Sequence, residues 1–179
     1  MPQRIYRDPV HNIIPLSEDS AEGRLMIQLI DAPEFQRLRR IKQLGLGLYT
    51  YQGAEHSRFT HSLGALHLMT RILERLTTGS NIDRADSAAA RAAALLHDVG
   101  HGPFSHAMEQ VLGIHHERMT VLAVTESETT LHRTLNAFAA DLPERVASII
   151  DGTFKPAALA QLVSSPENVI SRASRPLTQ

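Results

Sequence analysis

Apolar side chains recur at helical spacing along most of this chain, whereas its opening stretch follows a different pattern. Residues 5–17, IYRDPVHNIIPLS, mix β-branched side chains with Pro9 and Pro15, which favours an extended arm or a short hairpin. From Ser20 onward, apolar residues three or four positions apart predict a series of amphipathic helices. The predicted helices cover residues 20–29, 34–44, 61–76, 87–97, 104–112, 114–124, 131–140, 143–150 and 156–163.

Glycines and polar residues separate these helices and set the limits of the predicted domain. Gly45, Gly47 and Gly53 introduce a loop, LYTYQGAEHSRF, whose mixture of Tyr, His and Arg is typical of a ligand-facing surface. Beyond residue 165, two prolines and few apolar residues predict a disordered tail. We therefore expect an extended arm over residues 1–18, one helical domain over 19–165 and a disordered tail over 166–179.

The composition narrows the fold and excludes several classes of function. Aromatic residues make up only 4% of the chain while Ala and Leu are abundant, which favours an all-α fold. The net charge of -1 provides no broad basic surface for nucleic acid, and the absence of Cys excludes disulfides, thiolate zinc sites and thiol nucleophiles. No apolar run is long enough to span a bilayer, so we expect a cytoplasmic protein without a membrane partner.

The densest group of metal-binding residue types lies in the stretch AALLHDVGHGPFSH, residues 93–106. Its first residues predict a buried helix that carries His97 and Asp98 into the interior, where a carboxylate is costly unless a cation compensates it. His101 lies one helical turn after His97 and can reach the same space. Taken alone, a His-Asp pair at a helix end is more often a surface hydrogen-bonding pair than a metal site.

Five separated motifs extend the pattern beyond this stretch. In chain order they are RDPVHNII, DAPEFQRLRRIKQLG, HSRFTHSLGALHL, LLHDVGHGPFSHAME and HHE, within residues 5–165. Together they resemble the HD-domain metal-dependent phosphohydrolases, most closely the deoxynucleoside triphosphate triphosphohydrolase branch. The resemblance implies an all-α HD-domain helical bundle. It also implies a divalent metal ion (Mn, Fe, Co, Mg, Ni or Zn) held by His61, His97, Asp98 and an Asp on a later helix.

The same resemblance implies roles in catalysis and substrate binding. His116 corresponds to the family's catalytic His, and Glu109 to the acidic residue that orients it. The positions that correspond to substrate contacts are Arg58, His101 and His106 for the phosphates, and Gln43 and Leu44 for the deoxyribose. These residue types suit attack of a metal-polarised water on phosphorus and protonation of the departing nucleoside oxygen.

The chain departs from the family pattern after Ser165, where no residue matches the Asp that supplies the fourth ligand. Asp151 is the nearest later carboxylate in a predicted helical context, but it lies outside the family's motif. We interpret the chain as a truncated or frameshifted product of a longer enzyme, or as a natural short form. Waters can complete a three-ligand site, although its affinity for metal should be lower.

The function implied is metal-dependent hydrolysis of a dNTP to deoxynucleoside and triphosphate. The first alternative is an inactive nucleotide-binding or regulatory HD module that lacks a competent metal. The second is an HD phosphohydrolase acting on a signalling nucleotide, against which the motifs around Gln43 and Arg58 argue.

The resemblance also implies partners beyond the nucleotide substrate, namely a homo-oligomer and an effector nucleotide. Asp31, Gln36 and Arg39 match positions that hold a regulatory nucleotide in some oligomeric relatives. Arg7 and Ile13 stand where those relatives carry Asn and His, which argues against recognition of the same base. The alternative for these residues is a solvated basic helix face.

Overall fold

A hairpin opens the computed structural model, which describes residues 2–77, 83–104 and 106–154. β1 (Gln3–Asp8) and β2 (Asn12–Ser17) pair in antiparallel fashion. The Asp8 carboxylate closes the turn by accepting hydrogen bonds of 2.8 Å from two backbone N–H groups of that turn. β2 directs Ile14 and Leu16 into the core. Of the two forms predicted for the opening stretch, the hairpin is therefore the one found.

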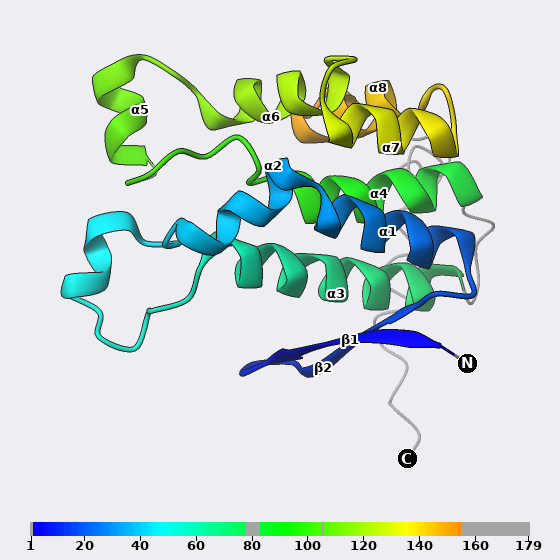
Figure 1. Ribbon diagram of the computed structural model, residues 1–179, viewed down its shortest axis with the longest axis horizontal. Helices are drawn as coiled ribbons and strands as arrows, with labels where there is room; N and C mark the ends of the chain where they lie inside the picture. The colour runs from blue at the N-terminus through cyan, green and yellow to red at the C-terminus, as the bar shows by residue number, and fades with distance from the viewer. Residues whose placement is uncertain (1, 78–82, 105, 155–179) are drawn as a thin grey trace, which may run out of the picture.

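The remainder of the described chain is mainly helical, which confirms the all-α prediction. Figure 1 shows the hairpin against one side of a bundle of roughly aligned helices, with α5 projecting from one end. Within the described residues the helices are α1 (Ala21–Asp31), α2 (Pro33–Gln36), η1 (Arg37–Arg40), η2 (Gly45–Tyr49), α3 (Arg58–Thr77), α4 (Arg84–Leu96), α5 (His106–Leu112), α6 (His116–Thr125), α7 (Thr130–Phe138) and α8 (Leu142–Ile150), where η1 and η2 are 3₁₀ helices.

α4 is the central helix of the bundle because its small side chains allow close approach by its neighbours. Ala88, Ala89 and Ala92 are fully buried, and α1, α3 and α8 pack around this helix. Leu95 and Leu96 at its C-terminal end are also fully buried, which ties this end of the helix to the core. The predicted metal-binding residues follow directly after this anchored end.

The prediction of a continuous helix over residues 34–44 is wrong in its second half. After the single turn of α2 the chain tightens into η1, and Ile41 then adopts extended backbone angles, φ -109° and ψ 113°. Arg37 in η1 donates a hydrogen bond of 2.7 Å to the carbonyl of Val99. Lys42 pairs with Ser57 in an isolated β-bridge. Contacts with distant segments therefore replace the helical hydrogen bonds that local periodicity predicts.

The other predicted helices within the described residues are found, with their ends displaced by a few residues. The helix predicted over 156–163 and the tail predicted over 166–179 lie outside the part of the chain that the structure describes.

Among the described helices, none combines the length and apolar character that crossing a membrane requires.

Candidate functional site

His61, His97 and Asp98 come together at the end of the bundle where α3 begins and α4 ends. The Nε2 atoms of His61 and His97 lie 3.2 Å apart. The Asp98 carboxylate lies 3.5 Å from His97 Nε2 and 3.8 Å from His61 Nε2. One donor atom from each residue lies within 4.8 Å of the others. The structure thus brings the three predicted ligands to one point, and we name them the first cluster.

Hydrogen bonds orient the first cluster for metal binding. His97 Nδ1 lies 2.9 Å from the carbonyl of Ala94, which requires the proton to be on Nδ1 and leaves the Nε2 lone pair directed into the cluster. Asp98 is only 5% exposed, and its Oδ2 accepts a hydrogen bond of 2.6 Å from the buried guanidinium of Arg58. The ion pair keeps this carboxylate in one orientation.

The electrostatics of the first cluster favour the protonation states that a metal requires. Burial lowers the pKa of His61, so its imidazole is neutral at pH 7. Burial alone would raise the pKa of Asp98, but the nearby charges of His97 and Arg58 outweigh it and hold the pKa below its ordinary value. Two imidazoles and one carboxylate form a donor set that can hold a divalent metal ion.

His101, His106, Glu109 and His116 form a second cluster next to the first. Glu109 is its centre, because its carboxylate lies 2.8 Å from His116 Nδ1 and 3.0 Å from His106 Nδ1. The ring of His101 stacks on that of His116 at 3.8 Å with an interplanar angle of 11°. His101 Nε2 lies 3.5 Å from Asp98 Oδ1, so this residue connects the two clusters.

The backbone after α4 positions the second cluster through a close contact with α6. A Cβ added at Gly100 would lie 2.1 Å from the carbonyl oxygen of His116, so only glycine fits at this position. Thr120 on α6 accepts a hydrogen bond of 2.9 Å from the N–H of Gly100 and donates one of 3.1 Å to the carbonyl of His97. The sequence pattern does not identify Thr120, because its pairing with Gly100 is visible only once α4 and α6 are packed.

Of the residues predicted to contact the sugar and the first phosphate, Arg58 lies beside Asp98. Arg58 lies between Asp98 and the backbone of Gln43. The Nη2 atom of Arg58 is 3.4 Å from the carbonyl oxygen of Gln43. Gln43 Oε1 is buried and finds no hydrogen-bond partner among the described residues. Leu44, in contrast, is exposed. The structure therefore places Arg58 and Gln43 together and leaves an acceptor at Gln43 available for a ligand donor.

Asp151 does not join either cluster. Its exposed carboxylate accepts hydrogen bonds from the N–H and the hydroxyl of Thr153 at 3.0 Å and 2.6 Å, which also lower its pKa. Within the described residues, no fourth His, Asp or Glu completes the group of His61, His97 and Asp98.

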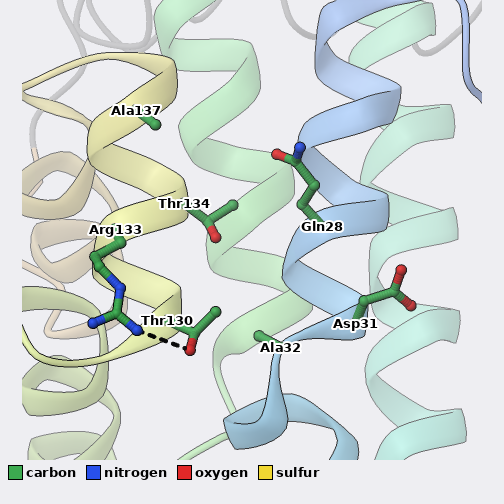
Figure 2. Close-up of a pocket in the computed structure, with 7 residues that line it drawn as sticks. All are labelled: Gln28, Asp31, Ala32, Thr130, Arg133, Thr134 and Ala137. Carbon is green, nitrogen blue, oxygen red and sulfur yellow. Dashed lines mark hydrogen bonds between the residues drawn. The ribbon is translucent and has the colours of Figure 1, made fainter.

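One hollow on the described surface adjoins the clusters, and another, with a larger volume, lies apart from them. The larger, about 520 Å³, lies between α1 and α7. Its lining residues are drawn in Figure 2: Gln28, Asp31, Ala32, Thr130, Arg133, Thr134 and Ala137. The smaller, about 190 Å³, is lined by Gly100, Gly102, Met108, Glu109, Leu112, Ile114, His116 and Met119. The convergent polar groups identify the smaller one as part of the candidate site, despite its volume.

The residues predicted to bind an effector are engaged in contacts within the chain. Asp31 points away from α7 in Figure 2 and pairs with Arg4 of the hairpin at 2.6 Å. Gln36 Nε2 donates to the carbonyl of Ile30, and its Oε1 accepts from Arg39, whose guanidinium lies 3.6 Å from the centre of the Phe59 ring. Asp31 lines the hollow between α1 and α7, whereas Gln36 and Arg39 do not.

The chain is similar to several known proteins. The chain is 39% identical to the uncharacterized protein YwfO of Bacillus subtilis over 164 residues, which cover 91% of this chain and 36% of that protein. It is 42% identical to human deoxynucleoside triphosphate triphosphohydrolase SAMHD1 over 106 residues, covering 58% of this chain and 16% of that one. A crystal structure of a phosphohydrolase from Bacteroides thetaiotaomicron superposes with a TM-score of 0.71 at 34% identity, covering 90% and 38% of the two chains.

The chain thus spans little more than a third of the length of YwfO and of the Bacteroides protein. A family model described as HD domain matches residues 58–173, which include every residue of both clusters. The chain belongs to the HD-domain family, as the spaced motifs predict.

Proposed function

We propose that this chain forms the metal- and phosphate-binding core of a phosphohydrolase that converts a dNTP to deoxynucleoside and triphosphate. The observation that carries the proposal is the contact between the two clusters, in which His101 lies between Asp98 and the Glu109–His116 pair. A site for a divalent cation then adjoins a carboxylate-oriented imidazole. Hydrolysis of a phosphoester requires these two elements side by side.

His61, His97 and Asp98 are the residues that would hold the metal ion, because their donor atoms converge. A bound divalent ion would polarise water and neutralise phosphate charge. Arg58 would add a fixed positive charge where a phosphate approaches Asp98, and His101 and His106 would offer N–H donors to the other phosphates.

His116 is the residue proposed to transfer a proton. Glu109 accepts the hydrogen bond of its Nδ1–H, which directs Nε2 away from Glu109. From that position Nε2 can donate a proton to the oxygen of the departing nucleoside. Gln43 Oε1, a buried acceptor without a partner in the described chain, suits a sugar hydroxyl as its donor, and Leu44 would cover the sugar.

With three ligands among the described residues, we expect little or no turnover by the 179-residue chain. One carboxylate compensates only one of the two charges of a divalent ion, so we expect weak retention of metal. Fusion of the Asp-bearing helix of a relative should strengthen retention and raise the rate. If Asp151 served as a substitute, Asp151→Asn would abolish turnover; we expect no effect, because this carboxylate is held by Thr153.

The direct experiment adds excess Mn²⁺ to the metal-free chain with each dNTP and measures triphosphate and deoxynucleoside. We expect little or no release by the chain itself, and metal-dependent release after fusion of the Asp-bearing helix that falls at least about a hundredfold in His116→Ala. His115→Ala is the matched control, because this neighbouring His is exposed and lies outside both clusters. Release of pyrophosphate or of monophosphate would contradict the proposed reaction. Turnover of a cyclic or polyphosphorylated signalling nucleotide in preference to dNTPs would favour the second alternative.

A regulatory nucleotide-binding module is the competing function, and the three-member ligand set is what favours it. It predicts that a dNTP binds without release of triphosphate, even with excess metal and after fusion of the Asp-bearing helix. Equilibrium binding measured beside the release assay separates the two functions.

The effector site and the homo-oligomer are a separate proposal. Binding of a nucleotide by Asp31, Gln36 and Arg39 would have to displace the Arg4–Asp31 pair and the Gln36–Arg39 hydrogen bond. Titration with guanine nucleotides and deoxynucleotides, followed by measurement of molecular mass in solution, tests it. An unchanged mass would leave these residues with the intramolecular role they have here.

A further inference from the structure

Three imidazoles converge on the single carboxylate of Glu109. The Nδ1 atoms of His116 and His101 approach Oε1 at 2.8 Å and 3.3 Å, and the Nδ1 atom of His106 approaches Oε2 at 3.0 Å. The residues come from α5, α6 and the loop after α4, so the convergence is a product of the tertiary structure rather than of one helix. The proposed proton transfer uses only His116 and Glu109 of this group.

His101 is the member whose position calls for a further ligand. It is 1% exposed, and its Nδ1 makes no hydrogen bond with any of the described residues, since the approach to Glu109 lacks hydrogen-bond geometry. A buried nitrogen that faces a carboxylate oxygen without a hydrogen bond is unfavourable. A cation placed between these two atoms would satisfy both.

The donor set specifies the kind of cation. Three imidazole nitrogens and one carboxylate oxygen, all within 4.8 Å of one another, match the ligands that zinc takes in proteins. Donors around a tetrahedral zinc with bonds of 2.0–2.1 Å lie about 3.4 Å apart, close to the separations already present. Magnesium and calcium prefer sets made of oxygen and are disfavoured here.

Small movements of the side chains would complete the geometry. The stacked rings of His101 and His116 have nearly parallel planes, so one must tilt for both Nδ1 atoms to face the same ion. His101 is enclosed, whereas His116 is partly exposed and borders the 190 Å³ hollow. His106, whose side chain is 68% exposed, already lies at a steep angle of 72° to the His116 ring.

We propose that His101, His106, Glu109 and His116 form a second metal site, selective for zinc and similar ions and separate from the first cluster. Zinc bound there releases the Nδ1 proton of His116 to solvent and occupies the Glu109 oxygen that accepts it, so the Glu109–His116 hydrogen bond is lost and the site is inhibitory. The inhibitory effect rests on the function proposed above, whereas metal binding does not. The ion is thus a competitor of the proton-transferring pair rather than a participant in hydrolysis.

The binding experiment titrates metal-free protein with Zn²⁺ and repeats the titration with Co²⁺, whose visible absorption reports a tetrahedral site. His61→Ala removes the first cluster, and we expect this variant to bind one equivalent. Adding His106→Ala to this variant should lower its affinity for that zinc ion at least about tenfold. Adding His115→Ala instead is the matched control and should leave it unchanged. Circular dichroism verifies folding, and the exposure of His106 and His115 makes both substitutions suitable.

The outcomes separate this proposal from the proposed hydrolysis. Zn²⁺ binding to His61→Ala that is lost with His106→Ala supports the second site, whatever the activity of the chain. Absence of Zn²⁺ binding to folded His61→Ala would overturn the second site. Zn²⁺ binding that survives when His106→Ala and Glu109→Gln are both added to His61→Ala would also overturn it. If the chain hydrolyses dNTPs with Mn²⁺, added Zn²⁺ should slow the reaction in parallel with occupation of this site; unchanged turnover at full occupation would overturn the inhibitory role.

Discussion

The two clusters share histidines and carboxylates but are supported in different ways. The first cluster lies at the ends of α3 and α4, and Asp98 follows directly after the fully buried Leu95 and Leu96. The second depends on α5, a helix that buries no residue and projects from the bundle in Figure 1. The first is therefore held by the core of the protein, whereas the α5 residues of the second are held mainly by polar contacts around Glu109.

The difference teaches which part of the site should tolerate change. Removal of one member of a buried ion pair lowers the stability of the whole domain, because the other charge is left buried without a partner. A group on an exposed short helix can rearrange locally at small cost. The following predictions are ordered from the largest expected effect to the smallest.

Loss of the charge partner of Asp98 tests how strongly the first cluster is coupled to the core. Arg58→Met leaves the buried carboxylate unpaired and should lower the free energy of unfolding by about 3–5 kcal/mol, measured by urea denaturation in EDTA. Arg4→Met, which breaks the exposed pair with Asp31, is the control and should cost about 0–1 kcal/mol. Equal effects of the two substitutions would contradict a core-supported first cluster.

A methyl group at Gly100 tests the contact that joins the two clusters. Its Cβ would lie 2.1 Å from the carbonyl of His116 and 2.5 Å from the nitrogen of Thr120, so α6 must move. Gly100→Ala should destabilise the chain by about 2–3 kcal/mol. Gly102→Ala is the matched control, since a Cβ there meets nothing within 4 Å. A crystal structure of Gly100→Ala should show His116 displaced from Glu109. An unshifted His116 would contradict the conclusion that the contact between Gly100 and α6 positions the second cluster.

The pH dependence of stability tests the burial of His101 between the clusters. Burial, followed by the charges of Arg58 and His116, lowers its pKa to about 4 from an ordinary value of 6.5. The unfolded chain therefore binds more protons than the folded chain between these values, and stability should fall as pH falls from 6.5 to 4.

Substitution isolates this contribution. His101→Gln should remove roughly 2 kcal/mol of that pH-dependent loss, whereas the exposed His115→Gln should keep the slope of the unmodified chain. The measurement is the free energy of unfolding by urea at intervals from pH 4 to 7. A slope unaffected by His101→Gln would show that this side chain does not titrate as its burial requires.

Substitutions in the supporting helices give the smallest effect and the sharpest contrast. Val111 on α5 is 75% exposed, so Val111→Ser should change stability by less than about 0.5 kcal/mol. Leu95→Ala on α4, where the side chain is fully buried, should cost about 2–5 kcal/mol and provides the reference. Thermal unfolding of both variants measures the two changes in stability. A large loss of stability in Val111→Ser would mean that α5 is covered by a part of the protein outside the described residues.

Much of the fold could be predicted because its signals are local. Helical spacing of apolar residues located the helices of the bundle, and the Ala-rich run before His97 predicted the buried helix that the structure contains. The resemblance to the HD-domain phosphohydrolases also implied the convergence of His61, His97 and Asp98, which the structure contains. Their roles as ligands, and those of Gln43, Leu44, Arg58, His101, His106, Glu109 and His116, stay predictions.

What the sequence alone determined is the set of helices and the residue types at their ends, because periodicity and helix breakers act over a few neighbouring residues. Tertiary structure decided which side chains meet. Arg58 pairs with Asp98 across 40 positions, and Arg37 with Val99 across 62, which also ends the helix predicted through residue 44. The contacts of the three imidazoles with Glu109 were likewise decided by the tertiary structure. Such contacts arise only when packing of the core brings distant segments together, since no local energy term connects them.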